Sequence, residues 1–159
     1  MNTSYHRRSQ TGKRGFTLVE IMIVVVIIGI LAAMAGVAFK HTRERAVATR
    51  IGNDLRIFAD AFQTYTLENG SYPDDVGSGV VPAGMEEYLN ASLFTSTTPA
   101  GGNYDWDKGV FGITAGVSLR GATVGAETIQ KIDDIIDDGN LSTGIVRSRT
   151  GGLLYIIEG

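Results

Sequence analysis

Glu20 is a lone carboxylate at the start of a long uncharged run, so its chemistry needs an explanation. The 19 residues at positions 21–39 are all apolar or glycine, and the pair Gly15-Phe16 lies just before them. A carboxylate beside apolar surroundings costs free energy unless it reaches water or pairs with a cation. Two interpretations follow: Glu20 lies at the depth of lipid headgroups, or it pairs with a positive charge inside an assembly.

A cut after Gly15 would create such a positive charge. The new α-amine of Phe16 has a reference pKa near ~8 and would be mostly protonated at neutral pH. Glu20 of the same chain is four residues further along, and the Phe16 amine of a neighbouring chain is an equally good partner in a packed bundle. A cut at this point would therefore give Glu20 a cation to pair with, either in its own chain or in an assembly.

The second group of reactive side chains is a candidate cation site near the C-terminal end. It consists of four carboxylates and one amide beside a glycine: Asp133, Asp134, Asp137, Asp138 and Asn140. Calcium prefers several oxygen ligands on a flexible loop, but this spacing does not match the EF-hand loop. A solvated helix end and turn is the competing interpretation. We expect no cofactor other than a calcium ion here.

Residues for catalysis are scarce. The chain has no cysteine, and its two histidines, His6 and His41, flank the uncharged run instead of sitting together. No phosphate-binding loop or nucleophile elbow is present in the sequence. We expect no catalytic residue and no enzymatic activity.

Charge is distributed unevenly along the chain. Residues 1–15 carry four Lys/Arg and no acid, whereas the chain from Asn69 onward carries five basic and twelve acidic residues. Such an acidic region is poorly suited to binding nucleic acid through its phosphates. The sequence therefore predicts a basic leader before an acidic head.

The uncharged run has the length of a membrane helix. Nineteen residues rise ~28 Å as a helix, close to the ~30 Å hydrocarbon core of a bilayer. Basic residues flank both ends of the run, so the positive-inside rule gives only a slight preference for an inside N-terminus. A secretory signal cut after Ala35 and a buried helix of a globular protein are the alternatives.

The helical pattern continues beyond the uncharged run. An apolar stripe recurs at steps of 4, 4, 3, 4 and 3 through Val47, Ile51, Leu55, Phe58, Phe62 and Tyr65. Polar residues are expected on the other faces: Arg43, Arg50, Asp54, Asp60 and Gln63. Asn69-Gly70 and Pro73 then supply a stop. We expect one helix over residues 16–68, with its second half lying against a sheet.

The remaining residues predict a small head. Residues 74–107 read as a loop with a short helix at 85–89, and Trp106 is expected to anchor this loop to the core. Strands are expected at 110–114 and 117–120, a helix at 127–136, and a closing hairpin at 145–149 and 153–157.

The N-terminal segment resembles a known signature. The stretch Gly-Phe-Thr-Leu-Val-Glu followed by Ile-Met-Ile-Val-Val-Val-Ile-Ile-Gly-Ile-Leu-Ala-Ala-Met-Ala is similar to the prepilin signature of type IV pilins and of type II secretion pseudopilins. The resemblance implies cleavage between Gly15 and Phe16, N-methylation of Phe16, and registration of subunits in a helical filament by Glu20. It further implies a cytoplasmic leader and a head outside the inner membrane.

Two further features bear on this resemblance. The family commonly has a proline where this chain has Val37, so loosening of the helix near Gly36 is an open question. The turn Asn69-Gly70-Ser71-Tyr72-Pro73 is similar to the turn that follows the long helix in major pseudopilins. Major pseudopilins can bind calcium in a head loop, although their ligands do not align with the acidic residues here.

The predicted fold is therefore α+β and pilin-like, with a long N-terminal helix packed on a small antiparallel sheet. We expect a leader (1–15), a transmembrane and assembly half of the helix (16–39), an amphipathic half (40–68) and a head (69–159). The expected function is that of a structural subunit of a type II secretion pseudopilus, anchored in the bacterial inner membrane with a periplasmic head.

The expected partners are a prepilin peptidase and N-methyltransferase, other copies and related pseudopilins, the inner-membrane assembly platform and the lipid bilayer, without nucleic acid. The alternatives are a type IV pilin or minor pilin of a pilus or DNA-uptake machine, and a membrane-tethered ligand-binding module.

Overall fold

The computed structural model describes residues 15–159, apart from the side chains of Ala35 and Val37. The expected leader therefore lies outside the described residues, except for Gly15. The chain divides into two compact units, Met1–Phe39 and Lys40–Gly159. The second half of the long helix thus belongs to the same unit as the head.

Helix α1 spans Leu18–Asn69, two residues shorter at its start than expected. Its part in the first unit exposes every described side chain, including Phe16 just before it at 82%. By length and composition, α1 is the one helix among the described residues that could cross a membrane. The backbone is helical at Gly36, where a glycine alone is tolerated at a cost of ~1 kcal/mol.

In the second unit, α1 buries the predicted stripe. Ile51, Leu55, Phe58 and Phe62 are fully buried, while Val47 and Tyr65 at the two ends are half-buried and pack against the same core. Helix α1 ends at Asn69, where Gly70 adopts a φ of 79° that favours glycine. The stripe and its stop are confirmed.

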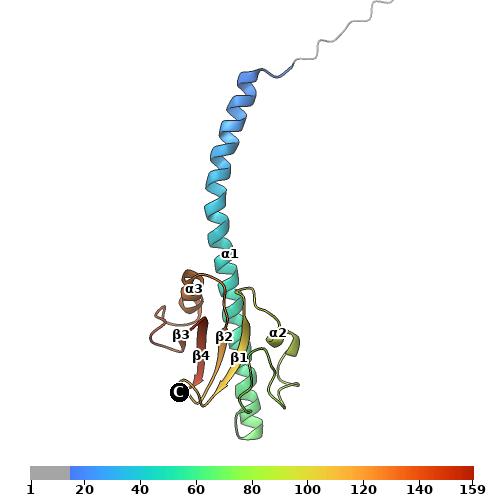
Figure 1. Cartoon of the computed structure of the whole chain (residues 1–159), viewed down its shortest axis with the longest axis vertical. Coiled ribbons are helices and arrows are strands. Elements are labelled where there is room, and N and C mark those ends of the chain that lie inside the picture. Colours follow the sequence, from blue (N-terminus) through green and yellow to red (C-terminus); the bar gives the residue numbers. More distant parts are fainter. Residues whose placement is uncertain (1–14) are drawn as a thin grey trace, which may run out of the picture. The chain divides into compact units, whose positions relative to one another are not determined.

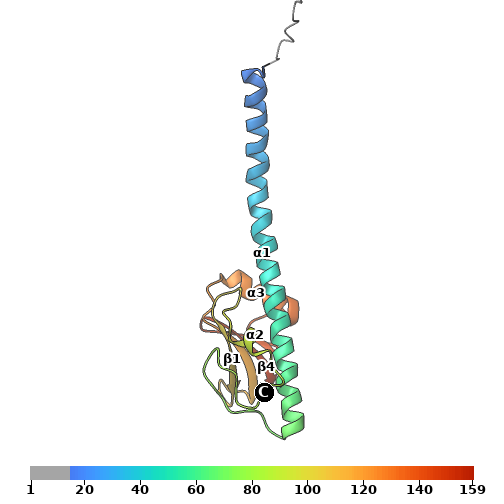
Figure 2. The same ribbon diagram turned by 90° about the vertical axis from the view of Figure 1, so that its right-hand side faces the viewer.

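The sheet that covers this stripe has four antiparallel strands in the order β1-β2-β4-β3 (Figures 1 and 2). Their bounds are β1 Asn103–Lys108, β2 Ala115–Arg120, β3 Val146–Arg149 and β4 Gly152–Glu158. Strands β3 and β4 form the predicted closing hairpin, with Arg149 opposite Gly152. In both views residues 40–69 of α1 run along one face of this sheet.

The expected strand at residues 110–114 is wrong. Those residues form the turn between β1 and β2, where Gly109 and Gly112 have positive φ and Phe111 has a φ of 55°. The strand lies earlier, at Asn103–Lys108, inside the segment expected to be a loop. Both faces of β1 are buried, and arginines pair with the carboxylates of Asp105 and Asp107.

The expected helix at residues 85–89 is also wrong, because these residues form turns. The short helix follows as α2, Ala91–Thr95, where the side chain of Asn90 accepts a hydrogen bond from the N–H of Leu93 at 3.1 Å. Helix α3, Ala126–Ile136, lies where a helix was predicted. Its Ile136 packs against Gly52 of α1, a position where a Cβ would lie 2.7 Å from the isoleucine side chain.

Aromatic rings fill the space between α1 and the sheet. Phe62 stacks on Trp106 with ring centroids 3.7 Å apart, and Phe58 meets Tyr104 edge to face. The Trp106 indole N–H donates to the carbonyl of Pro73 at 3.1 Å, so it anchors the loop as predicted. Asp54, expected on a polar face, is buried and accepts a hydrogen bond from the Tyr104 hydroxyl at 2.9 Å.

Candidate functional site

The start of α1 is built as a reciprocal cap. The Thr17 N–H and the Thr17 hydroxyl both donate to Glu20 Oε2 at 2.8 Å, and the Glu20 N–H donates to Thr17 Oγ1 at 3.3 Å. This is a capping box, in which two side chains satisfy backbone donors that have no partner within the helix. Within a single chain, Glu20 therefore stabilises the helix start.

The capping role of Thr17 was missed in the sequence. A threonine followed three residues later by a glutamate, just before an apolar run, is the signature of this cap. The charge of Glu20 and its apolar neighbours drew the interpretation toward pairing with an amine. Both roles use the same carboxylate, and the contacts to Thr17 all use Oε2, which leaves Oε1 for a second donor.

Gly15 and Phe16 lie in exposed, non-helical backbone before α1 begins. The space around a Cβ built on Gly15 is open to at least 4 Å, and its φ does not lie in the left-handed region. The fold therefore places no demand for glycine at position 15.

The candidate cation site forms from three of the five predicted residues. Asp133, Asp137 and Asp138 each bring one carboxylate oxygen to within 4.8 Å of the others. Asp134 points elsewhere and accepts a hydrogen bond from Gln130 at 3.1 Å, and Asn140 accepts from the N–H of Ser142. Asp133 and Asp134 face different sides of the helix, since Asp133 is buried and Asp134 exposed.

Asp133 is the unusual member of this site. Its side chain is fully buried at the end of α3, and neither carboxylate oxygen has a hydrogen-bond partner among the described residues. Burial raises its pKa, and the nearby carboxylates of Asp137 and Asp138 raise it further. An unpaired buried carboxylate is costly, so the site has an unmet need for a positive charge or a proton.

The loop after α3 holds the other two carboxylates in place. Asp137 Oδ2 accepts the N–H of Val146 at 2.8 Å, and a Cβ at Gly144 would lie only 2.0 Å from that oxygen. Asp138 accepts from the Thr143 hydroxyl at 2.7 Å and from the N–H of Asn140, which lowers its pKa. Carboxylates fixed in this way around a buried third are a donor set suited to a hard cation such as calcium.

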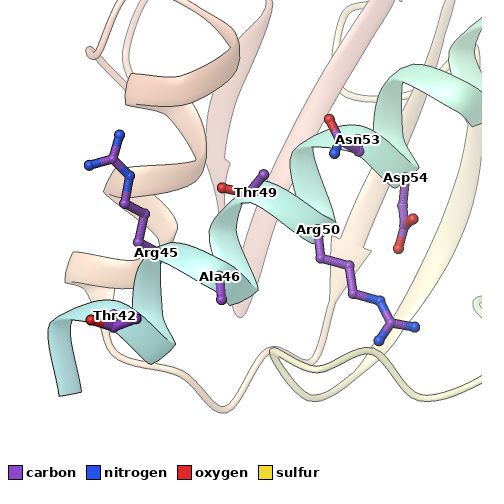
Figure 3. Close-up of a pocket in the computed structure, with 7 residues that line it drawn as sticks. All are labelled: Thr42, Arg45, Ala46, Thr49, Arg50, Asn53 and Asp54. Carbon is purple, nitrogen blue, oxygen red and sulfur yellow. The ribbon is translucent and has the colours of Figure 1, made fainter. Parts of the chain in front are cut away.

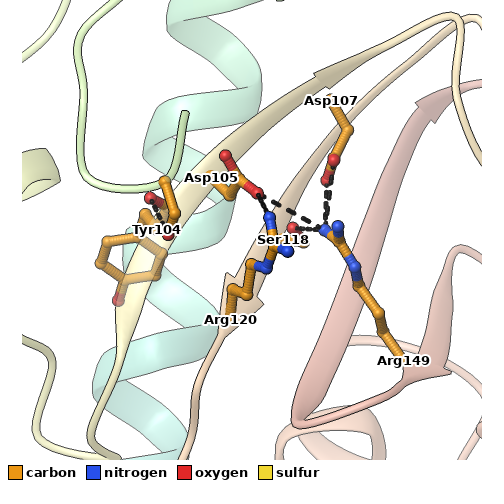
Figure 4. A network of polar contacts seen from close by, with 7 residues as sticks. Tyr104, Asp105, Asp107, Ser118, Arg120 and Arg149 are labelled. Carbon is orange, nitrogen blue, oxygen red and sulfur yellow. Dashed lines mark hydrogen bonds and ion pairs between the residues drawn. The ribbon is translucent and has the colours of Figure 1, made fainter. Parts of the chain in front are cut away.

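A second group of buried carboxylates, on β1, differs because its charge is balanced (Figure 4). Arg149 donates to both oxygens of Asp107, at 2.9 and 3.1 Å, and lies 3.7 Å from Asp105, which Arg120 also approaches at 3.5 Å. Phe111 covers the Arg149 guanidinium at 4.1 Å. Burial raises the pKa of both aspartates, but two guanidiniums offset two carboxylates, so this network holds strands β1, β2 and β3 together.

The unpaired state of Asp133 generates a prediction about pH. A raised folded-state pKa means that the cost of Asp133 is absent at low pH and appears as pH rises above its ordinary value of about 4. With a chelator present, Asp133→Asn should therefore raise the midpoint of thermal unfolding of the full chain in detergent micelles, and the gain should grow between pH 4 and pH 7.

Asp134→Asn is the matched control, since it removes a neighbouring exposed carboxylate. Its midpoint should follow the unchanged protein across the same pH range. An effect of Asp133→Asn that is equal at pH 4 and pH 7 would contradict an ionised, unpaired Asp133.

Comparison with known proteins shows which of them this chain resembles. Residues 10–36 match the model of the prokaryotic N-terminal methylation motif. The chain is similar to "Type II secretion system core protein G" of Pseudomonas aeruginosa, with 43% identity over 67 residues that make up 42% of this chain and 45% of that protein. The protein of the same name from Klebsiella pneumoniae is 39% identical over 61 residues, 38% of this chain and 44% of that protein.

The counterpart in Vibrio cholerae is 33% identical over 97 residues, 61% of this chain and 58% of that protein. The chain thus spans about half the length of the curated relatives it matches. No solved structure matches it. Together, these findings show a chain with an N-terminal methylation motif and a pilin-like α+β architecture that is similar, over part of its length, to core protein G of type II secretion systems.

Proposed function

We propose that the chain is a structural subunit of a type II secretion pseudopilus, a helical filament anchored in the inner membrane that helps drive protein export. One observation carries this proposal: the apolar first part of α1, residues 18–39, exposes every described side chain and begins with a capped carboxylate inside an N-terminal methylation motif. The similarity to core protein G of type II secretion systems supports the same reading. The role is structural, without catalysis.

The exposed apolar surface of residues 18–39 requires a cover. A soluble monomer rarely leaves so large an apolar surface in water. Before assembly, lipid of the inner membrane covers this apolar surface, and in the filament the helices of other subunits cover it. In this proposal the head of residues 69–159 is periplasmic, and assembly takes place on an inner-membrane platform together with related pseudopilins.

Processing creates the partner of Glu20. A prepilin peptidase cuts the exposed peptide bond between Gly15 and Phe16 and methylates the new amine of Phe16. The Glu20 carboxylate then accepts from two partners. Thr17 of its own helix donates to Oε2, and the amine of a neighbouring subunit donates to Oε1. An ion pair shielded from water is stronger than one in water. A subunit in the wrong register would leave both charges unpaired in apolar surroundings, which costs free energy.

Intact-mass spectrometry of the protein isolated from its native host tests the proposal. The mature chain should begin at Phe16 and carry one added methyl group. A chain that begins at Gly36, after Ala35, would instead show an ordinary secretory signal and would overturn the proposal.

Glu20→Ala should separate assembly from processing. The variant should enter the membrane and be cut after Gly15, because the apolar run is unchanged, but it should form few or no filaments, measured by electron microscopy of sheared cell-surface material. Thr17→Ala is the matched control for the cap: it removes the hydroxyl that contacts Glu20 but keeps the carboxylate, so it should assemble far better than Glu20→Ala. Normal filaments from Glu20→Ala would show that Glu20 serves only the helix start.

We further propose that Asp133, Asp137 and Asp138 bind a calcium ion in the mature head. The support is the donor set itself, three converging carboxylates of which one is buried without a partner. A bound dication supplies the positive charge that Asp133 lacks and fixes the loop of residues 137–146 against α3. This loop leads directly into β3, so the ion would stabilise the closing hairpin.

Calcium should accordingly stabilise the full chain in detergent micelles. At a free calcium concentration 100 times the dissociation constant, binding to the folded state alone adds ~2.7 kcal/mol to the free energy of unfolding. Asp133→Asn should lose this gain, measured as the shift in thermal midpoint between chelator and calcium. Asp134→Asn should keep it, and an equal calcium shift in both variants would place the ion elsewhere.

A further inference from the structure

Charge is segregated within the second unit in a way that the core does not explain. Residues 40–56 carry five basic and two acidic side chains. Residues 57–107 carry eight acidic side chains and no basic one. The first stretch belongs wholly to α1, whereas the second comprises the last turns of α1, the segment after it with α2, and β1 up to Asp107. The second unit therefore has one basic and one acidic region along its chain.

The basic region has charges that its own unit leaves unpaired. Arg43, Arg45 and Arg50 are exposed, and none of them takes part in an ion pair among the described residues. The two acids of this region are already engaged. Glu44 pairs with Lys40 and Lys131, and Asp54 is buried beneath the Tyr104 hydroxyl.

Two of these arginines flank a row of small, uncharged side chains on α1, which we call the ridge. Thr42, Ala46, Thr49 and Asn53 follow one another at steps of 4, 3 and 4 on the exposed side of the helix, and all four lack charge. Arg45 and Arg50 line the same shallow groove and extend to opposite sides of this row (Figure 3). Small side chains between two cations form a surface on which an acidic segment can lie close to the helix.

The acidic region presents its charges at the other end of α1 in this unit. Glu68, Glu86 and Glu87 are exposed. The Tyr88 hydroxyl donates to Glu68 at 2.5 Å, and the Tyr65 and Tyr88 rings meet edge to face at 5.4 Å, so the turn with Glu86 and Glu87 lies beside the last turns of α1. Eighteen residues of helix separate Arg50 from Glu68, a rise of ~27 Å.

We propose that the ridge between Arg45 and Arg50 binds the acidic end of a second copy of this chain, formed by Glu68, Glu86 and Glu87. The two surfaces differ and lie at opposite ends of one head, so the contact is head-to-tail. A head-to-tail contact that does not close into a ring continues as an open helical filament. This inference rests on the proposed pseudopilus and adds the residues by which neighbouring heads recognise each other.

The charges would select the register more than they would add affinity. Exposed ion pairs contribute little individually because water and salt screen them. Like charges brought together are unfavourable, however, so acidic end against acidic end is disfavoured and each copy accepts the next in one direction. The apolar helices supply the cohesion, and the arginines and glutamates fix the axial step.

Charge reversal tests the contact in whole cells that assemble the unchanged chain. Arg45→Glu with Arg50→Glu, and separately Glu86→Lys with Glu87→Lys, should each reduce the mass of sheared filaments at least about tenfold, because each brings like charges together. All four changes in one chain should restore filaments. Arg147→Glu is the matched control, since Arg147 is exposed but lies on β3, and it should assemble normally.

The membrane content of each variant distinguishes the partner. If the arginines instead bind anionic lipid headgroups, the arginine reversal should lose filaments together with membrane retention, the glutamate reversal should assemble normally, and the fourfold variant should not recover. That pattern would overturn the proposal. Equal filament mass in all variants would overturn it as well.

A disulfide offers a direct readout because the chain has no cysteine. Arg50→Cys together with Glu87→Cys should give a ladder of covalent multimers in filaments under oxidising conditions, and Arg147→Cys with Glu87→Cys should give none. A chain that fails to assemble even unchanged would refute the pseudopilus proposal itself. If the variant with Arg50→Cys and Glu87→Cys forms filaments normally but gives no disulfide-linked multimers, only the contact proposed here would be refuted.

Discussion

The exposed apolar surface of α1 before Lys40 is the constraint on which the rest of the molecule depends. No described side chain of residues 15–39 is covered by the protein, and the core of the second unit is built from other residues. An apolar surface of this size calls for a cover from outside the chain. The carboxylate of Glu20 lies at the start of this surface. Thr17 donates hydrogen bonds to it but carries no charge, so the negative charge of Glu20 is not neutralised within one chain.

The head uses α1 as one wall of its core. Ile51, Leu55, Phe58 and Phe62 lie beneath the sheet, and the stacked pair of Phe62 and Trp106 ties the helix to β1. A displacement of residues 40–69 of α1 would therefore move the sheet with it, because a close-packed interior deforms little. The head thus presents its outer surfaces in a fixed orientation to residues 40–69 of α1.

Buried carboxylates occur twice in the head, with opposite consequences. On β1, Asp105 and Asp107 are offset by Arg120 and Arg149, so their charges hold strands together. At the end of α3, Asp133 has no such partner and lies among other acids. Buried aspartates therefore stabilise the fold where arginines pair with them and destabilise it where no cation is near. The difference lies in which cations the fold brings near.

The sequence by itself determined the long helix, its buried stripe, its stop at Asn69-Gly70, α3 and the closing hairpin, because periodicity and turn residues are local signals. The lone acid beside an uncharged run drew attention to Glu20, and the resemblance to the prepilin signature pointed to Gly15 and Phe16. Only the tertiary structure decided that β1 lies at Asn103–Lys108 and that Asp133, Asp137 and Asp138 converge without Asp134 and Asn140. The buried aspartates of β1 are offset by Arg120 and Arg149, and Arg149 comes from a strand some forty residues away, so no local pattern records that pairing.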